Sequence, residues 1–183
     1  MADHETVLDY WLNTVGPAGW YKADPAVDAE IRRRFEGEVL AARRGEHDAW
    51  ILHPREALAL MVLLDQFPRN IWRGAPEAFS CDAHAVALAK RALNMRHDEK
   101  VPEPERQFFY LPLMHHESQM DQDRCVRLII TKMPETGVDN LKHAVAHRDV
   151  IRKFGRFPFR NEALGRTCTP EEQAWLQGGG YRV

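Results

Sequence analysis

The chain has 183 residues, the length of one ordinary domain, and can bury a core without disulfide bonds. Hydrophobic residues make up 44% and charged residues 28% of the sequence, which excludes a disordered or fibrous protein. The formal net charge of -2 gives no general attraction to nucleic acid or to an anionic membrane, so we expect neither as a partner.

In chain order, the predicted elements are all helices. They cover residues 24–45, 54–67, 81–93, 112–132, 139–154 and 169–178, with a short segment over 102–109. The helix over 54–67 is apolar on several sides and should lie in the middle of the domain. We predict one all-α domain over residues 1–183, built of antiparallel helical hairpins, with seven or eight helices and loose ends at 1–5 and 178–183.

Capping signals mark where several of these helices begin. Asp24 precedes a proline at the first helical position, which is typical of a helix start. Ser80 and Asp139 are expected to cap the helices that follow them. Thr169-Pro170-Glu171-Glu172 is a strong capping box.

The cellular compartment follows from what the chain lacks. Its apolar run from Leu58 to Leu64 is too short to cross a bilayer, and residues 1–5 do not resemble a signal peptide. Cys81, Cys125 and Cys168 are far apart and form no Cys-x-x-Cys pair. We therefore expect a cytoplasmic protein with reduced thiols and no structural zinc.

One short motif occurs twice. Phe67-Pro68-Arg69-Asn70 recurs loosely as Phe157-Pro158-Phe159-Arg160-Asn161, each time after a predicted helix. Proline ends a helix, and asparagine can hold a turn by bonding the backbone. The repetition predicts either two helical hairpins of similar build or two unrelated helix ends.

Several long motifs are distinctive. They are Val7–Trp11, Trp20-Tyr21, Leu63–Gly74, Tyr110–Glu117, His147–Asn161 and Leu164–Arg166. Together they resemble, in order and over nearly the whole chain, a bacterial family known only as domain of unknown function 924. The resemblance implies a helical fold similar to tetratricopeptide-repeat proteins, and it implies no activity.

The chain departs from that family at two positions. The usual His-Ser-Glu is here His115-His116-Glu117, and Phe159 stands where the family often has histidine after the second Phe-Pro. If that family histidine is catalytic, this protein lacks it.

The predicted helix from Pro112 carries carboxylates on an apolar face. At helical spacing, that face contains Leu113, Glu117, Asp121, Cys125 and Leu128. Inward carboxylates need partners, because an unpaired buried charge is costly. Arginines in the turns are the obvious partners, either in a structural ion-pair network or around a pocket for an anionic ligand.

Histidines add possible acid/base chemistry. His147 is predicted on an inner helix face, as a hydrogen-bonded core residue or as a general base beside Glu117 or Asp65. His115 and Glu117 are two positions apart and cannot chelate one metal ion on a helix, so we expect no metal site. No activated serine or cysteine is evident.

Nucleic-acid and nucleotide binding are disfavoured. Residues 148–166 carry a net charge of +4, from six basic and two acidic residues, interleaved with phenylalanines. A packed corner explains this composition more simply. No phosphate-binding glycine loop is present, and we expect no cofactor.

Two hypotheses remain. The first, which we favour, is a binding protein or enzyme with an internal polar pocket for a small anionic ligand. Its catalytic candidates are His115, Glu117 and His147, and its ligand-binding candidates are Asp65, Arg69, Asn70, Arg156, Arg160, Asn161 and Arg166. The second is a helical-repeat scaffold for a protein partner, in which the same network is purely structural. The sequence leaves homo-oligomer formation open.

Overall fold

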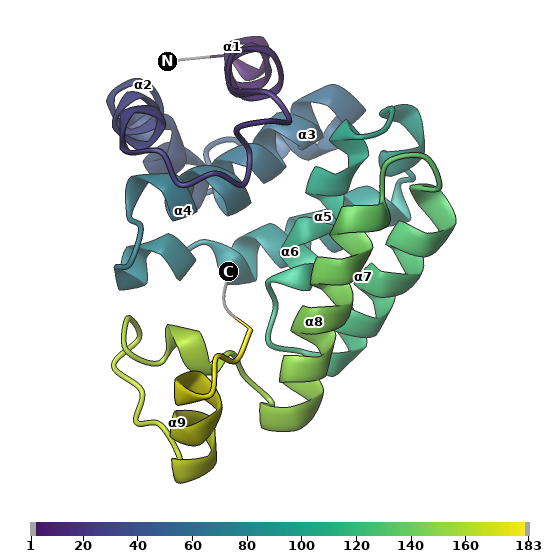
Figure 1. The fold of residues 1–183 in the computed structure, drawn as a ribbon. Coiled ribbons are helices and arrows are strands. Elements are labelled where there is room, and N and C mark those ends of the chain that lie inside the picture. Colours follow the sequence, from purple (N-terminus) through teal and green to yellow (C-terminus); the bar gives the residue numbers. More distant parts are fainter. Residues whose placement is uncertain (1–2, 182–183) are drawn as a thin grey trace.

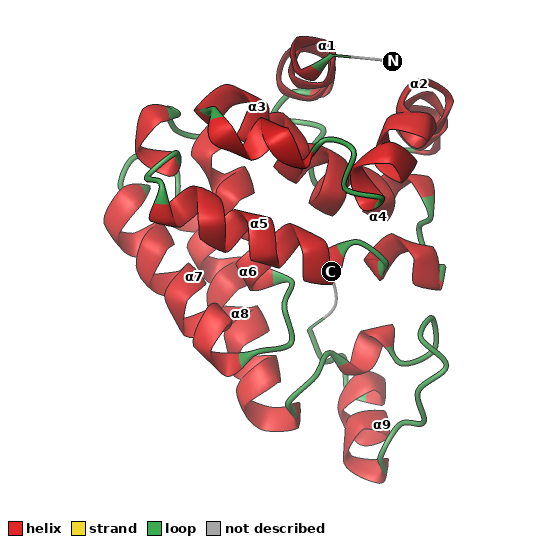
Figure 2. Ribbon diagram, turned by 180° about the vertical axis from the view of Figure 1, so that it is seen from behind, coloured by secondary structure: helices red, strands yellow, loops and turns green. Residues whose placement is uncertain are grey.

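The computed structural model describes residues 3–181, and within them every regular element is a helix (Figures 1 and 2). The α-helices are α1 (His4–Leu8), α2 (Pro25–Arg43), α3 (Pro54–Met61), α4 (Phe67–Ile71), α5 (Asp82–Asn94), α6 (Leu111–Met114), α7 (Gln119–Lys132), α8 (Val138–Phe154) and α9 (Pro170–Gln177). Two π-helical stretches, Asp9–Val15 and Val62–Gln66, extend α1 and join α3 to α4. Counted as uninterrupted α- or π-helical runs and without the short 3-10 helices, the described residues form eight helices, which confirms the predicted all-α class.

The core is centred on the continuous run from α3 to α4. Residues 57–68 are all buried, so the most apolar predicted helix does lie in the middle. Aromatic side chains from α2 and the first helical run close around it, with Phe35 and Trp11 at ring-centroid distances of 5.0 and 5.6 Å from Phe67. Each fully buried side chain of this size contributes about 1.5–3 kcal/mol to stability.

The helix starts with the strongest local signals lie where the sequence places them. The Asp24 carboxylate accepts the Ala26 N–H at 2.9 Å and begins α2. At α9, Thr169 and Glu172 form the predicted capping box. Both caps depend only on residues within one turn, which is why sequence reasoning finds them.

The two other predicted caps are wrong. The Ser80 hydroxyl donates to the Glu77 carbonyl oxygen at 2.7 Å, closing the 3-10 turn Pro76–Phe79 instead of capping α5. Asp139 lies inside the first turn of α8, where it pairs with Lys142 at 2.8 Å.

The single helix predicted over 112–132 is also wrong, because the chain breaks at residues 115–118 between α6 and α7. The buried Gln122 amide donates to the carbonyl oxygens of Met114 and His116 at 2.6 and 2.8 Å. These bonds satisfy the end of α6 and stabilise the break. Glu117 therefore lies in a turn and not on one helical face with its predicted neighbours.

The two Phe-Pro motifs adopt different backbones. Pro68 does not end its helix: Phe67 N–H donates to Val62 O in the π-helical stretch, and the chain continues as α4. This change of register accommodates the ring of Pro68, which has no N–H to donate. Pro158 instead begins the 3-10 turn Pro158–Arg160 after α8 has ended.

The last three helices form two groups, a hairpin and a small lobe. Helices α7 and α8 pack side by side as a hairpin, and residues 156–181 form a small lobe around α9 (Figure 1). Gly155, at φ 71°, ends α8 in the left-handed conformation and turns the chain into this lobe. A second small core of Val150, Ile151 and Phe157 holds the lobe to α8.

Two expectations concern the ends and the membrane. Of the expected loose ends, residues 1–2 and 182–183 lie outside the described residues. His4 and Glu5 belong to α1, and Glu5 pairs with Arg55 at 2.6 Å. Among the described helices, none combines the length and the apolar character that a membrane crossing requires.

Candidate functional site

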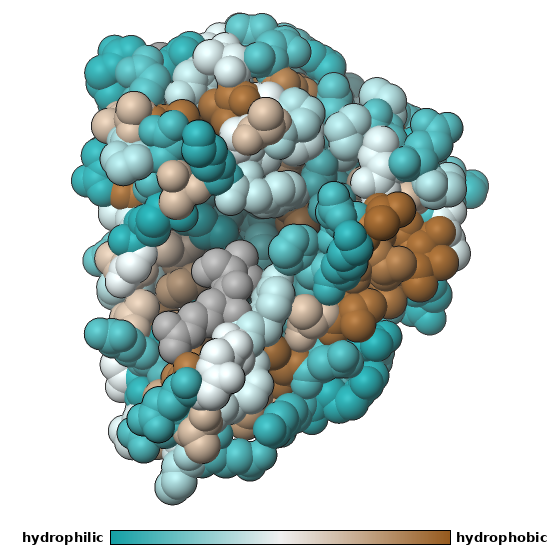
Figure 3. Space-filling view, viewed as in Figure 1, coloured by the Kyte–Doolittle hydropathy of each residue, from teal (hydrophilic) through white to brown (hydrophobic). Residues whose placement is uncertain are grey.

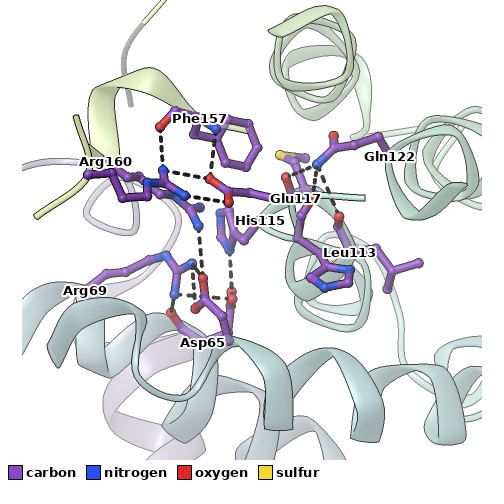
Figure 4. Close-up of polar contacts among 12 residues, drawn as sticks. Asp65, Arg69, Leu113, His115, Glu117, Gln122, Phe157 and Arg160 are labelled. Carbon is purple, nitrogen blue, oxygen red and sulfur yellow. Dashed lines mark hydrogen bonds and ion pairs between the residues drawn. The ribbon is translucent and has the colours of Figure 1, made fainter. Parts of the chain in front are cut away.

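A buried carboxylate–histidine pair forms the centre of the polar site (Figure 4). Asp65, in the π-helical stretch before α4, is 1% exposed, and its Oδ1 lies 2.7 Å from His115 Nδ1. Arg69 lies one turn further on, with Nη1 3.4 Å from the same Oδ1. Burial raises the pKa of Asp65, but His115 and Arg69 outweigh this effect and lower it to about 2. Asp65 is therefore ionised and accepts a hydrogen bond from His115.

The arginines of the two Phe-Pro motifs meet at a carboxylate that sequence reasoning missed. Asp82, in the first turn of α5, lies 3.0 Å from Arg69 Nη2 and 3.1 Å from Arg160 Nη1. Arg160 is 6% exposed, and its guanidinium lies over the Phe157 ring at 4.5 Å. Nothing in the local sequence distinguishes Asp82 from an ordinary aspartate at a helix start.

Glu117 is matched by an arginine from the second motif region, as the sequence predicts. Its carboxylate accepts Arg166 Nη1 and Nη2 at 2.8 and 3.0 Å and the Phe157 N–H at 2.8 Å. Arg166 Nε in turn donates to Asn161 at 2.9 Å. Burial raises the pKa of Glu117, but the hydrogen bonds from Arg166 and the Phe157 N–H have the larger combined effect, so the pKa lies below its ordinary value.

Another predicted ligand-binding residue, Arg156, forms its contacts within the C-terminal lobe. It forms a two-pronged ion pair with Glu172, with Nε at 2.6 Å and Nη2 at 2.8 Å. The same carboxylate accepts the Asn161 amide and the Thr169 N–H. Arg156 and Asn161 thus hold the lobe together by charge-assisted hydrogen bonds.

A cavity of about 410 Å³ opens beside the Asp65–His115 pair. It lies between α4 and the loop 20–23 on one side and α6, α8 and the C-terminal residues on the other. Its size falls within the usual range for small-molecule sites, about 300–1,000 Å³. Three cationic side chains, Lys22, Arg69 and Arg73, line it, and no carboxylate of the described residues does.

The cavity brings together part of the predicted site. Arg69, Asn70, His115 and His147 line it, and Asp65 lies directly behind His115. The other candidates, which form the ion-pair network beside the cavity, do not line it: Glu117, Arg156, Arg160, Asn161 and Arg166.

Sequence reasoning missed other lining residues. They are Trp20, Tyr21, Lys22, Ala23, Gln66, Arg73, Leu111, Met114, Asn140, His143 and Tyr181. Some of them occur in the distinctive motifs, and this is the only feature of the sequence that points to them as candidate site residues. Their convergence depends on how the first loop and the C-terminal lobe pack.

His147 lines the same cavity and is almost fully buried, at 2% exposure. Its Nδ1 lies 2.8 Å from the His143 carbonyl oxygen, and its Nε2 has no hydrogen-bond partner. Burial, with His115 nearby, lowers the pKa of His147 to about 3. Burial and Arg69 also lower the pKa of His115, more than Asp65 raises it. Both imidazoles are therefore neutral at pH 7.

Other chemistries find less support within the described residues. No three His, Cys, Asp or Glu side chains there are grouped so as to hold a metal ion. Cys125 is fully buried, which raises the pKa of its thiol and leaves it un-ionised at neutral pH. The polar groups arranged around the cavity are cations, amides, tyrosine hydroxyls and imidazoles, of which those of His115 and His147 are neutral.

The fold and site define a class of protein: an all-helical domain with a cavity lined by cationic side chains and histidines. The chain belongs to a family of bacterial proteins of unknown function, DUF924, whose sequence profile matches residues 7–180. It is similar to the solved structure of ATU0120, a protein of unknown function from Agrobacterium tumefaciens, with 41% sequence identity and a TM-score of 0.89. That likeness covers 96% of this chain and 97% of the other. A comparison with curated proteins found no match.

Proposed function

We propose that this protein binds a small organic anion in the cavity beside Asp65 and His115. The observation that carries the proposal is the charge of the lining, which includes Lys22, Arg69 and Arg73 and no carboxylate among the described residues. Arg69 and Arg73 also pair with carboxylates outside the lining, Asp82 and Asp28. An entering anion therefore meets these two cations and Lys22, while the nearest carboxylates are held in ion pairs.

The lining also indicates an organic body on the ligand. Trp20, Leu111 and Met114 contribute apolar surface opposite the polar groups. At about 30 Å³ per water molecule, the cavity has room for roughly 14 waters, which matches a ligand with an aromatic ring or short carbon chain. A small organic acid or phosphate ester fits both features.

The proposal includes acid/base chemistry at His115. Its ring is neutral, and Asp65 fixes its orientation through Nδ1, an arrangement in which Nε2 can accept a proton. Glu117 is not part of this proposal, because Arg166 and the Phe157 N–H occupy its carboxylate. We place the protein in the cytoplasm, because its three cysteines are free thiols.

Calorimetric titration at low salt tests the anion site. Phenylacetate and benzyl phosphate should bind the wild-type protein at least tenfold more tightly than neutral phenylacetamide, which has the same ring. The double variant Lys22→Gln/Arg73→Gln should bind both anions roughly three- to tenfold more weakly, because two partly exposed charges are removed.

Arg33→Gln is the matched control, because Arg33 is an exposed arginine on α2 outside the cavity lining. It should bind the anions as the wild type does. Equal binding of phenylacetate and phenylacetamide, or equal weakening by Arg33→Gln, would contradict an anion site in this cavity.

A second candidate function, a scaffold for a protein partner, is favoured by one surface feature. Apolar side chains gather over α7 and α8 in the space-filling view (Figure 3). Ile130 and Val138 are 57% and 64% exposed at the end of this hairpin. Exposed apolar patches often mark contact surfaces, for another protein or for a second copy of this chain. The variant Ile130→Asp/Val138→Asp should then abolish any association seen by analytical ultracentrifugation while leaving anion binding unchanged.

A further inference from the structure

The protonation pattern of the two cavity histidines is fixed by their partners. The His147 Nδ1 atom faces the His143 carbonyl oxygen at 2.8 Å, and a carbonyl has no proton to donate, so Nδ1 must carry the N–H. The His115 Nδ1 atom faces the Asp65 carboxylate at 2.7 Å, and it too must be the donor. A neutral imidazole has one N–H, so Nε2 of each ring is an acceptor.

The two histidines border the same cavity. Both rings line it, with their centroids 6.1 Å apart. The Nε2 atom of His147 is buried without a partner, and no contact within the described residues occupies Nε2 of His115. A buried acceptor that lacks a donor is unfavourable, so Nε2 of His147 gains a favourable interaction when a donor reaches it.

The tyrosine hydroxyls and the Arg69 guanidinium beside the cavity already have partners. Tyr181 Oη lies 2.6 Å from His143 Nδ1, and Tyr21 Oη donates a hydrogen bond to the Gln107 side-chain oxygen. Arg69 directs its guanidinium to Asp65 and Asp82. The donor for the imidazoles is therefore either a water molecule or a group of the ligand that fills the cavity.

We infer that the ligand is a hydroxylated organic anion, such as a hydroxy acid or a hydroxyalkyl phosphate, whose hydroxyl group donates to Nε2 of His147 or His115. This inference rests on the proposed anion site and names the class of ligand that the site selects. A site built to accept a hydroxyl proton discriminates strongly against an analogue without it, because the acceptor is then left buried and unpaired. His147 provides this selectivity from the wall of the cavity, and the cationic side chains provide the attraction for the anionic group.

Matched ligand pairs test the inference by titration calorimetry at pH 7.5. Mandelate differs from phenylacetate, and glycerol 3-phosphate from propyl phosphate, mainly in hydroxyl groups. In the wild-type protein, the hydroxylated member of at least one pair should bind about tenfold or more tightly than its partner. In His147→Phe this preference should fall to within about threefold, because the ring remains and the acceptor is lost.

The results separate this inference from the proposed function. If the hydroxylated and plain anions bind equally in the wild type, the inference is wrong while the anion site stands. If no anion of either kind binds, both are wrong. A full hydroxyl preference in a folded His147→Phe variant would also overturn the role of His147, whereas the wild-type comparison requires no variant to fold.

Discussion

At the scale of single residues, His115 shows that burial and a carboxylate partner shift the pKa of a histidine in opposite directions. His115 keeps a buried carboxylate as neighbour, yet burial and Arg69 hold its pKa below the ordinary value. His147 has only a carbonyl oxygen as its bonded partner, and its pKa falls further, to about 3. The sequence predicts both as inner histidines, but their neutral state depends on a cavity wall that no local pattern reveals.

This neutrality predicts how stability depends on pH. In the unfolded chain a histidine takes up a proton near pH 6.5, whereas native His147 takes it up only near pH 3. Between these values the unfolded state binds more protons, so the free energy of unfolding falls as the pH is lowered from 6.5 toward 4. Each such histidine contributes up to about 1.4 kcal/mol per pH unit.

Urea unfolding followed by circular dichroism at pH 7.0, 6.0, 5.0 and 4.5 measures this slope. In His147→Phe the slope should be shallower by up to about 1.4 kcal/mol per pH unit, because one buried neutral histidine is removed. A slope identical to that of the wild type would show that native His147 titrates normally.

At the scale of elements, the sequence predicts the helix starts with the strongest local signals, but it places the caps at Ser80 and Asp139 wrongly and misses what distant contacts decide. The starts of α2 and α9 follow from caps within a few residues. The break between α6 and α7 depends on Gln122 reaching back to two carbonyl oxygens, and the apolar pattern alone suggests an unbroken helix. Glu117 pairs with an arginine as expected, but it does so from a turn and not from the predicted inward helix face. The meeting of Arg69 and Arg160 at Asp82 was not predicted.

The turn between α6 and α7 should be a main attachment of the C-terminal lobe. Glu117 accepts hydrogen bonds from Arg166 and from the Phe157 N–H, so Glu117→Ala leaves both donors without their acceptor. We expect a loss of about 2–3 kcal/mol and faster amide hydrogen exchange across residues 157–166 than in α3. Unfolding by urea and exchange read by mass spectrometry measure the two effects.

Glu30→Ala is the control, because Glu30 pairs with Arg33 on the exposed face of α2. Its effect should stay within about 0.5 kcal/mol. If the two alanine variants are equally stable, the Glu117 contacts do not hold the lobe.

At the scale of the whole molecule, positive and negative side chains are distributed unevenly, which the net charge does not show. The chain has a net charge of -2, yet three cations and the neutral imidazoles of His115 and His147 line the cavity. The balancing carboxylates, Asp28, Asp65 and Asp82, lie outside the lining. One wall belongs to the first half of the chain, and the other includes α8 and Tyr181 near the C-terminus. The cavity therefore depends on the packing of segments that are far apart in the chain, which no single segment of sequence shows.

The central claim is that His115 and His147, which line a cavity that binds an organic anion, carry unprotonated Nε2 atoms without partners among the described residues. A multiple-bond ¹H–¹⁵N spectrum of histidine-labelled protein at pH 7, recorded with and without mandelate, tests it most directly. We predict that both rings carry their proton on Nδ1 and that at least one Nε2 resonance shifts as mandelate saturates the site. A protonated Nε2 on either ring in the free protein, or Nε2 resonances that mandelate leaves unchanged, would contradict the account.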